Sequence, residues 1–277
     1  MADESRRVPY LSAFGIYRNE ADYLREWIEF HKLVGFERFL LYDNFSTDQH
    51  LEVLAPYIAD GTVVQHQWHV EPGQPAAYRD VLERHCEDTV WLGILDIDEF
   101  LFSPTGEKVS DILREFEEFP GVAVNCISFG NAGHMTRQPG LAIENYLMRC
   151  EVDKPRNRII KSIVRPPEVE DIGSDPHYFR YREGKRAVTE RKEPLKGSLT
   201  DAVSVERLRV NHYLTRSQEE REQKIAGSNA WLGGPRDLPK AKERDKMLNA
   251  EEDTVILRYA PALREAMGLS AVPARPG

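Results

Sequence analysis

The chain has 277 residues, of which 41% are hydrophobic and 30% are charged, a composition typical of a folded globular protein. Its formal net charge of −9 provides no general positive field for a polyanion, so we expect no nucleic-acid partner. No stretch approaches the ~20 apolar residues of a membrane span, and the first residues lack the apolar centre of a signal peptide. With three cysteines and no CxxC spacing, the sequence predicts a cytoplasmic protein without a transmembrane segment.

The first hundred residues alternate between short apolar runs typical of strands and longer segments with helical spacing. Residues 18–36 show the helical spacing clearly, with Leu24, Trp27 and Ile28 on one face. Such alternation predicts right-handed βαβ units, and therefore an α/β fold with a mainly parallel central sheet. The predicted strands are 10–17, 36–44, 62–69 and 91–102, and the predicted helices lie within 18–36, 46–61 and 74–88.

Beyond residue 130 the alternation weakens. Residues 131–200 are rich in Arg, Lys, Pro and Gly, which indicates loops that could form a site. We divide the chain into a main domain, 1–230, and a C-terminal helical extension with a frayed tail, 231–277. The predicted elements of the main domain are a helix at 109–121, strands at 122–130 and 205–214, and a polar helix capped by Ser217.

The apolar run WLGILDIDEFLF, residues 91–102, carries Asp96, Asp98 and Glu99 at its centre. An ionised carboxylate that leaves water needs a cation or hydrogen-bond donors, so we expect a positive group to meet them. In a strand, Asp96 and Asp98 would share one face, and Glu99 would face the other way. At the carboxyl end of a parallel strand, the aspartates would suit Mg²⁺ or Mn²⁺ with a nucleotide diphosphate as co-ligand. The alternative is an ordinary surface turn.

Several motifs in fixed order carry a resemblance to a known family. They are RNEADYLREWIEFHKLVGFERFLLYDNFSTD (18–48), WLGILDIDEFLF (91–102), KSIVRPPEV (161–169) and RVNHYLTRSQEEREQK (209–224). Over residues 10–225 the chain resembles the family 2-like and family 92-like glycosyltransferases of bacteria. The resemblance implies the GT-A fold, a Rossmann-like fold of nucleotide-diphospho-sugar transferases. It also implies transfer of a sugar, with inversion, from a UDP-sugar donor to a hydroxyl of a glycan or another acceptor.

The resemblance assigns nucleotide-binding roles to two loops. Arg18, Asn19 and Glu20 follow the first strand and would line the nucleotide pocket. Asp43 and Asn44 match the first two positions of the family's DDGSTD pattern, which contact the nucleoside. Asn44 departs from the pattern, but its amide can still accept from and donate to a base edge. The alternative for these polar residues is helix capping and turn formation.

The resemblance also assigns a metal site. Asp96 and Asp98 match the DxD motif that binds Mn²⁺ or Mg²⁺ together with the sugar diphosphate. His212 matches the place of a third metal ligand, with His177 as its rival, and an imidazole would favour Mn²⁺. The alternative for either histidine is a structural role.

Other charged and glycine-containing segments leave alternatives open. Lys161 and Arg165 could contact the leaving phosphate or lie on a solvated strand face. Residues 129–134, FGNAGH, could form a wall of the acceptor site or a plain turn. The spacing does not identify a catalytic base among five carboxylates, which are Glu144, Glu168, Glu170, Asp171 and Asp175. A solvated helix face is predicted for Arg216, Glu219, Glu220 and Lys224.

Two further functions remain open. Another metal-dependent phosphoryl enzyme, such as a nucleotidyltransferase, could use the same acidic pair. However, DIDEF lacks the Thr or Val of aspartyl phosphatases, and the chain has no GxxxxGK(S/T) motif. A non-catalytic GT-A-like protein could bind the nucleotide without turnover.

Overall fold

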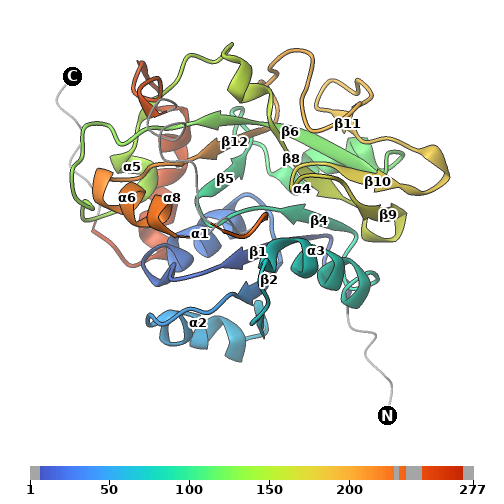
Figure 1. Ribbon diagram of the computed structural model, residues 1–277, viewed down its shortest axis with the longest axis horizontal. Helices are drawn as coiled ribbons and strands as arrows, with labels where there is room; N and C mark the ends of the chain where they lie inside the picture. Colours follow the sequence, from blue (N-terminus) through green and yellow to red (C-terminus); the bar gives the residue numbers. More distant parts are fainter. Residues whose placement is uncertain (1–6, 228–230, 235–244, 271–277) are drawn as a thin grey trace.

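The computed structural model describes residues 7–227, 231–234 and 245–270. Figure 1 shows helices and strands alternating through the first part of the chain, followed by shorter elements. The strands are β1 (Leu11–Tyr17), β2 (Arg38–Asp43), β3 (Val63–Gln67), β4 (Trp91–Ile94), β5 (Glu99–Phe102), β6 (Gly121–Ser128), β7 (Met148–Arg149), β8 (Ile160–Val164), β9 (Val169–Ile172), β10 (Phe179–Tyr181), β11 (Val188–Thr189), β12 (Arg209–His212) and β13 (Glu251–Glu252). The helices are α1 (Ala21–Leu33), α2 (His50–Ala59), α3 (Gly73–Arg84), α4 (Val109–Leu113), α5 (Ala142–Asn145), α6 (Gln218–Ala226) and α8 (Ala260–Ala266).

The central sheet has the strand order β3-β2-β1-β4-β8-β6-β12-β5, with β11 beside β6. Neighbours among β3, β2, β1 and β4 are parallel, as the alternation of strands and helices requires. β8 is antiparallel to β4 and β6, and β12 is parallel to β6 but antiparallel to β5. The predicted α/β fold with a mainly parallel central sheet is confirmed. Its sheet is parallel in the first half and mixed in the second.

Residues 91–102, predicted as one strand, form two strands at different places in the sheet. β4 and β5 lie four places apart in the strand order, although the turn 95–98 is all that separates them. Four strand spacings amount to ~19 Å, whereas five extended residues reach ~18 Å. The chain also turns back, since the Glu99 N–H donates to the Asp96 carbonyl (3.0 Å). The sheet therefore curls, and the prediction that Asp96 and Asp98 share a strand face is wrong because both lie in the turn.

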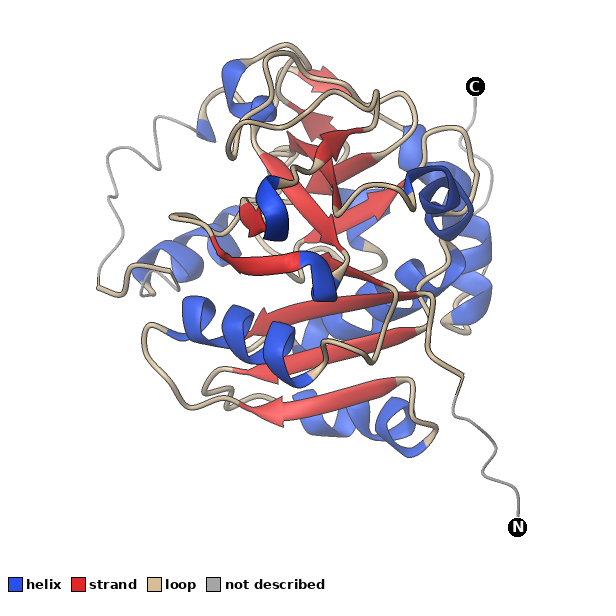
Figure 2. Ribbon diagram, turned by 90° about the vertical axis from the view of Figure 1, so that its right-hand side faces the viewer, coloured by secondary structure: helices blue, strands red, loops and turns tan. Residues whose placement is uncertain are grey.

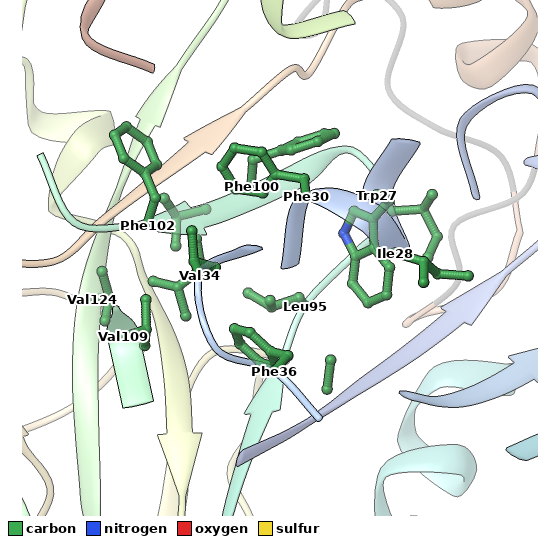
Figure 3. Packing of buried hydrophobic residues seen from close by; sticks show 14 of the residues in the cluster. Trp27, Ile28, Phe30, Val34, Phe36, Leu95, Phe100, Phe102, Val109 and Val124 are labelled. Atoms are coloured by element: carbon green, nitrogen blue, oxygen red, sulfur yellow. The ribbon is translucent and has the colours of Figure 1, made fainter. Parts of the chain in front are cut away.

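Helix α1 packs its apolar side onto the sheet, as its spacing predicts. Leu24, Trp27 and Ile28 are fully buried in the core between α1, α2, α8 and one face of the sheet. Figure 3 shows the ring of Phe30 beside that of Phe100 from β5, and the two ring centroids are 5.1 Å apart. This packing fixes β5 against α1. It thereby also fixes the end of the turn 95–98, the acidic turn.

Two hydrogen bonds also join α1 to β5. The indole N–H of Trp27 donates to the Glu99 carbonyl (2.9 Å), and the Leu101 N–H donates to His31 Nε2 (3.2 Å). His31 Nδ1 in turn lies 2.8 Å from the Trp27 carbonyl, which makes Nδ1 the protonated nitrogen. Because His31 is fully buried, its pKa is lowered to about 3. The imidazole is therefore a neutral bridge between helix and strand.

The opposite face of the sheet is covered by α3 and the β9–β10 hairpin. Tyr78 of α3 stacks on Phe179 of β10 and packs edge-on against Phe14 of β1. Figure 2 shows helices on both sides of the stacked strands. The sheet is thus buried on both faces, as expected for parallel strands.

The described part of the predicted C-terminal extension joins the same core. β13 pairs with β7, and Ile256 and Leu263 are fully buried. The predicted frayed tail, 271–277, lies outside the described residues. No helix in the described ranges is both long and apolar enough to cross a membrane.

Candidate active site

The acidic turn lies where the sheet brings several strand ends together. β1 and β2 end at Tyr17 and Asp43, which are paired, and β4 runs parallel to them into the turn. From the other half of the sheet, β12 pairs with β5 so that His212 lies opposite Glu99. The Tyr213 N–H donates to the Asp98 carbonyl (2.8 Å), which fixes the end of β12 to the turn.

His212 lies between two of the acidic side chains. Its Nε2 is 3.5 Å from Asp98 Oδ2, and its Nδ1 is 3.5 Å from Glu99 Oε1. Glu99 Oε1 is buried, and within the described residues it has no hydrogen-bond partner. The other oxygen of Glu99 accepts the Asp96 N–H (2.9 Å). Glu99 therefore holds the backbone of the turn with one oxygen and faces the imidazole with the other.

Lys161 of β8 supplies the positive charge expected for the acidic run. Its Nζ is 2.9 Å from Asp96 Oδ2 and 2.9 Å from Glu99 Oε2, and its side chain is 2% exposed. Burial by itself would lower the pKa of Lys161, but these two carboxylates hold it well above its usual value. A direct contact between Lys161 and a phosphate would require the ammonium to leave both partners. Its predicted phosphate role remains a prediction that this placement does not favour.

Helix α6 lies over the acidic turn, contrary to the prediction of a solvated face. Lys224 Nζ contacts Asp98 Oδ2. Arg216 forms an ion pair (2.6 Å) with Glu20 of the first loop, residues 18–20 after β1. The Cζ atom of Arg216 lies 3.6 Å from the centre of the Tyr23 ring. The prediction is correct for the exposed Glu219 and wrong for Arg216, Lys224 and the half-buried Glu220.

A sequence signal for this placement of α6 does exist. The predicted Ser217 cap is confirmed, and Glu220 completes a capping box with it. Glu220 also contacts the hydroxyl of Tyr23 and accepts a hydrogen bond from Tyr146 (3.2 Å). Glu220 and Lys224 follow each other at the i, i+4 spacing of one helix face, and Arg216 directly precedes the cap. A capped helix directly after a strand that ends in His212 could therefore have been placed with that face toward the site.

The aspartates are held in their charged form. Burial would raise the pKa of Asp98, but the Lys224 ammonium and His212 hold it well below its usual range. Desolvation acts in the same direction on Asp96, and Lys161 reverses it, so the pKa of Asp96 is lowered. For Glu99 burial prevails over Lys161, and its pKa is raised. Asp96 and Asp98 are thus ionised, as metal ligands must be.

The donor atoms beside the acidic turn are of the types that bind a divalent cation. Asp96, Asp98 and His212 offer carboxylate and imidazole donors, and Glu99 lies where it can hold the imidazole through Nδ1, leaving Nε2 toward Asp98. In the described ranges, no group of three or more His, Cys, Asp or Glu side chains already converges as a metal site. The Asp98 oxygen nearest His212 is the one that Lys224 contacts.

His177 has different surroundings. Its carbonyl accepts the Ser162 hydroxyl (2.8 Å), and its buried Nδ1 has no hydrogen-bond partner among the described residues. Burial, aided by the charge of Lys161, lowers the pKa of His177 to about 4. The geometry thus favours His212 over His177 as the histidine that belongs with Asp98.

The predicted nucleotide-binding loops adjoin this cluster but hold much of their own polar surface. Asn19 and Asp43 accept backbone N–H groups of the turn at 46–47 (2.8 and 2.9 Å). The Asn44 amide donates to two carbonyls of the segment 68–70 (2.8 and 3.0 Å). These contacts are the turn-forming alternative, and the nucleotide roles of the three residues remain predictions.

Arg18 and Glu20 lie at the two ends of the first loop. Arg18 is half exposed, 3.6 Å from Glu71 and 5.9 Å from the centre of the Phe45 ring. Glu20 faces inward to Arg216. The structure therefore brings the first loop into contact with the segment that leads into α6. The nucleotide-binding roles of Arg18 and Glu20 also remain predictions.

The candidate carboxylates for a catalytic base lie outside the contacts of the acidic turn. The Asp175 side chain accepts the His177 N–H (2.9 Å), and Glu170 is exposed. The other three form ion pairs elsewhere: Glu144 with Arg264, Glu168 with Lys185, and Asp171 with Arg180. None is singled out by its position.

A polar cavity of about 340 Å³ lies beside the start of α6. Thr215, three residues after His212, forms part of its wall together with Asn131 of the 129–134 loop and Gln218. The remaining described lining residues are Asp245, Lys246 and Asn249. Amide and hydroxyl side chains of this kind can bind polar, uncharged groups.

The whole arrangement can be compared with known proteins. A sequence model of glycosyltransferase family 92 matches residues 13–229. The chain therefore belongs to glycosyltransferase family 92, which confirms the resemblance found in the sequence.

Individual relatives match a part of their own length. A glycosyltransferase family 92 protein of Oryza sativa subsp. japonica is 33% identical over 176 residues, covering 62% of this chain and 30% of that protein. A galactan β-1,4-galactosyltransferase of Arabidopsis thaliana is 27% identical over 213 residues, covering 65% of this chain and 41% of that protein. The chain spans about a third of the length of the curated relatives it matches. Among solved structures, S. aureus TarS 1–349 in complex with UDP-GlcNAc is similar over 73% of this chain and 58% of the TarS chain. The sequence identity is 13% and the TM-score is 0.41.

Proposed function

We propose that the chain transfers a sugar from a nucleoside-diphosphate-sugar donor, a UDP-sugar, to an acceptor hydroxyl with inversion at the sugar carbon. Asp96, Asp98 and His212 would hold the Mn²⁺ or Mg²⁺ that this transfer requires. When bound, the metal supplies positive charge that stabilises the departing nucleoside diphosphate. Membership of glycosyltransferase family 92 supports the class of reaction.

The observation that carries the proposal is the meeting of Asp98 and His212. Asp98 directly precedes β5, His212 ends the neighbouring strand β12, and their side chains approach to 3.5 Å. The pKa of Asp98 is held well below its usual range, so its carboxylate is available to a cation at neutral pH. Such a pair would suit Mn²⁺ better than Mg²⁺, because imidazole nitrogen is a softer ligand than oxygen.

The surrounding residues would keep this pair in place. Glu99 holds the backbone of Asp96 and faces Nδ1 of His212, so it is a positioning residue. Lys161 neutralises Asp96 and Glu99 from inside the core. A rigid support of this kind is what a metal site needs if its ligands are to keep their geometry.

The donor and the acceptor would approach from different sides. The nucleoside would lie against Arg18, Asn19, Glu20, Asp43 and Asn44, at the carboxyl ends of β1 and β2. The polar cavity beside Thr215 has a lining suited to sugar hydroxyls, so we place the acceptor there. A glycan acceptor agrees with the printed name of the Arabidopsis relative, a galactan galactosyltransferase.

The direct test is a screen of nucleotide sugars by thermal unfolding, with Mn²⁺ and with a chelator. A ligand at 100 times its Kd should stabilise the fold by about 2.7 kcal/mol. Sugars that stabilise the protein with Mn²⁺ are then incubated with candidate glycans, and the products are identified. Release of UDP together with a glycosylated acceptor is the expected result.

Three other results would contradict the proposal. Release of pyrophosphate or inorganic phosphate would point to a nucleotidyltransferase or another phosphoryl enzyme. Binding of UDP without any effect of Mn²⁺, and without turnover, would point to a non-catalytic nucleotide-binding protein. No stabilisation by any nucleotide sugar would rule out a donor site. The variant Asp98→Asn should lose transfer, and Asp153→Asn, which changes an exposed aspartate outside the cluster, is its control.

A further inference from the structure

Lys224 occupies the position beside Asp98 where a metal cation would be expected to bind. It lies in the last turn of α6, and its Nζ contacts Asp98 Oδ2. That same oxygen is 3.5 Å from His212 Nε2. The Asp98 side chain is 5% exposed, whereas that of Lys224 is 34% exposed. The ammonium thus reaches a buried carboxylate from the solvent side.

Two other cations near the acidic turn, Lys161 and Arg216, are more firmly held. Lys161 is 2% exposed and lies 2.9 Å from each of two carboxylates. Arg216 is 12% exposed, pairs with Glu20, and packs on the face of the Tyr23 ring. Among these three, Lys224 is the most exposed. Its flexible four-carbon stem allows the ammonium to point elsewhere without moving the helix.

We propose that Lys224 is a binding residue for the diphosphate of the donor, and that its ammonium leaves Asp98 for the diphosphate when the metal binds. This inference rests on the proposed function of the site. A divalent cation at Asp98 would repel an ammonium on the same oxygen, and the repulsion is strong because water is largely excluded there. The diphosphate shares the metal's coordination shell, which makes it the nearest anion for the released ammonium.

The proposal predicts opposite effects on two affinities. Without the ammonium, the metal alone has no competitor at Asp98, so it should bind more tightly. The nucleotide diphosphate, however, loses a cationic partner, so it should bind more weakly when metal is present. A lysine that only supports the fold would weaken both affinities when removed, and a lysine in an unimportant surface pair would change neither.

The experiment measures both affinities by calorimetry on the full chain. Lys224→Met removes the charge and keeps most of the stem, Lys224→Gln is a second neutral variant, and Lys224→Arg restores a cation. The control is Lys154→Met, because Lys154 has a similar exposure of 38% and also pairs with one carboxylate, Glu151, at 2.7 Å. Mn²⁺ is titrated alone, and UDP is then titrated at saturating Mn²⁺.

Both neutral variants should bind Mn²⁺ more tightly than the wild type and bind UDP about tenfold more weakly, the effect of losing one charged hydrogen bond. Lys224→Arg should recover most of the UDP affinity, and Lys154→Met should match the wild type. Weaker Mn²⁺ binding by the neutral variants, or unchanged UDP affinity, would overturn the proposal. A wild-type chain that binds neither Mn²⁺ nor UDP would overturn the proposed function as well, which separates the two failures.

Discussion

Replacing Lys161 with Met should destabilise the fold by about 3 to 5 kcal/mol, the usual cost of removing one partner from a buried ion pair. The ammonium lies 2.9 Å from Asp96 and 2.9 Å from Glu99. Glu99 is 1% exposed, so water cannot take the place of the lost cation. Methionine has nearly the same length and shape, which leaves the loss of charge as the main change.

The assay is unfolding in urea followed by circular dichroism, with the free energy of unfolding extrapolated to water. The control Lys154→Met removes a surface charge and should stay within about 0.5 kcal/mol of the wild type. A second control combines Lys161→Met with Glu99→Gln. Because Glu99 then carries no charge, the double variant should be more stable than the sum of the two single changes predicts.

A contact of Lys161 with the donor phosphate predicts different results. If Lys161 contacts the donor phosphate, Lys161→Met should weaken UDP binding and change the free energy of unfolding by less than about 1 kcal/mol. That pair of results would refute the assignment of Lys161 as the internal partner of the acidic turn.

Three further predictions concern the site and the core. Asp98→Asn should keep the fold and abolish transfer, because an amide oxygen is a poor ligand for a hard cation; near-normal turnover at saturating Mn²⁺ would contradict the metal assignment. His212→Ala should raise the Mn²⁺ requirement of transfer about tenfold or more, and a requirement raised by His177→Ala alone would reverse that choice. The pKa of His31 is lowered to about 3 in the fold. Since the unfolded chain takes up this proton near pH 6.5, the wild type should lose about 2 kcal/mol from His31 between pH 7 and 5. His31→Gln should lack this loss in urea unfolding at the two pH values, whereas the core variant Phe36→Leu should retain it.

The sequence by itself determined the buried side of α1, the cap of α6 and the parallel half of the sheet. The spacing of Leu24, Trp27 and Ile28 predicted the buried side of α1, and Ser217 was recognised as a helix cap. The alternation of strands and helices predicted the parallel half of the sheet. The cost of burying carboxylates also predicted that a cation would meet the acidic run. These features depend on periodicity, on capping by neighbouring residues and on the cost of burying a charge, which can be read from the residue types and their spacing.

Only the tertiary structure decided which side chains come together at the site. The pairing of β12 with β5 brings His212 to Glu99, more than a hundred positions away in the chain. The curl of the sheet and the packing of α6 select Lys161 and Lys224 as the cations, where the sequence offers many lysines. The run 91–102 has strand-like composition throughout, yet its polar centre turns so that β5 can pair at the far end of the sheet. Periodicity states which side of an element is buried, but the neighbour against which it is buried depends on the free energy of the whole packed core.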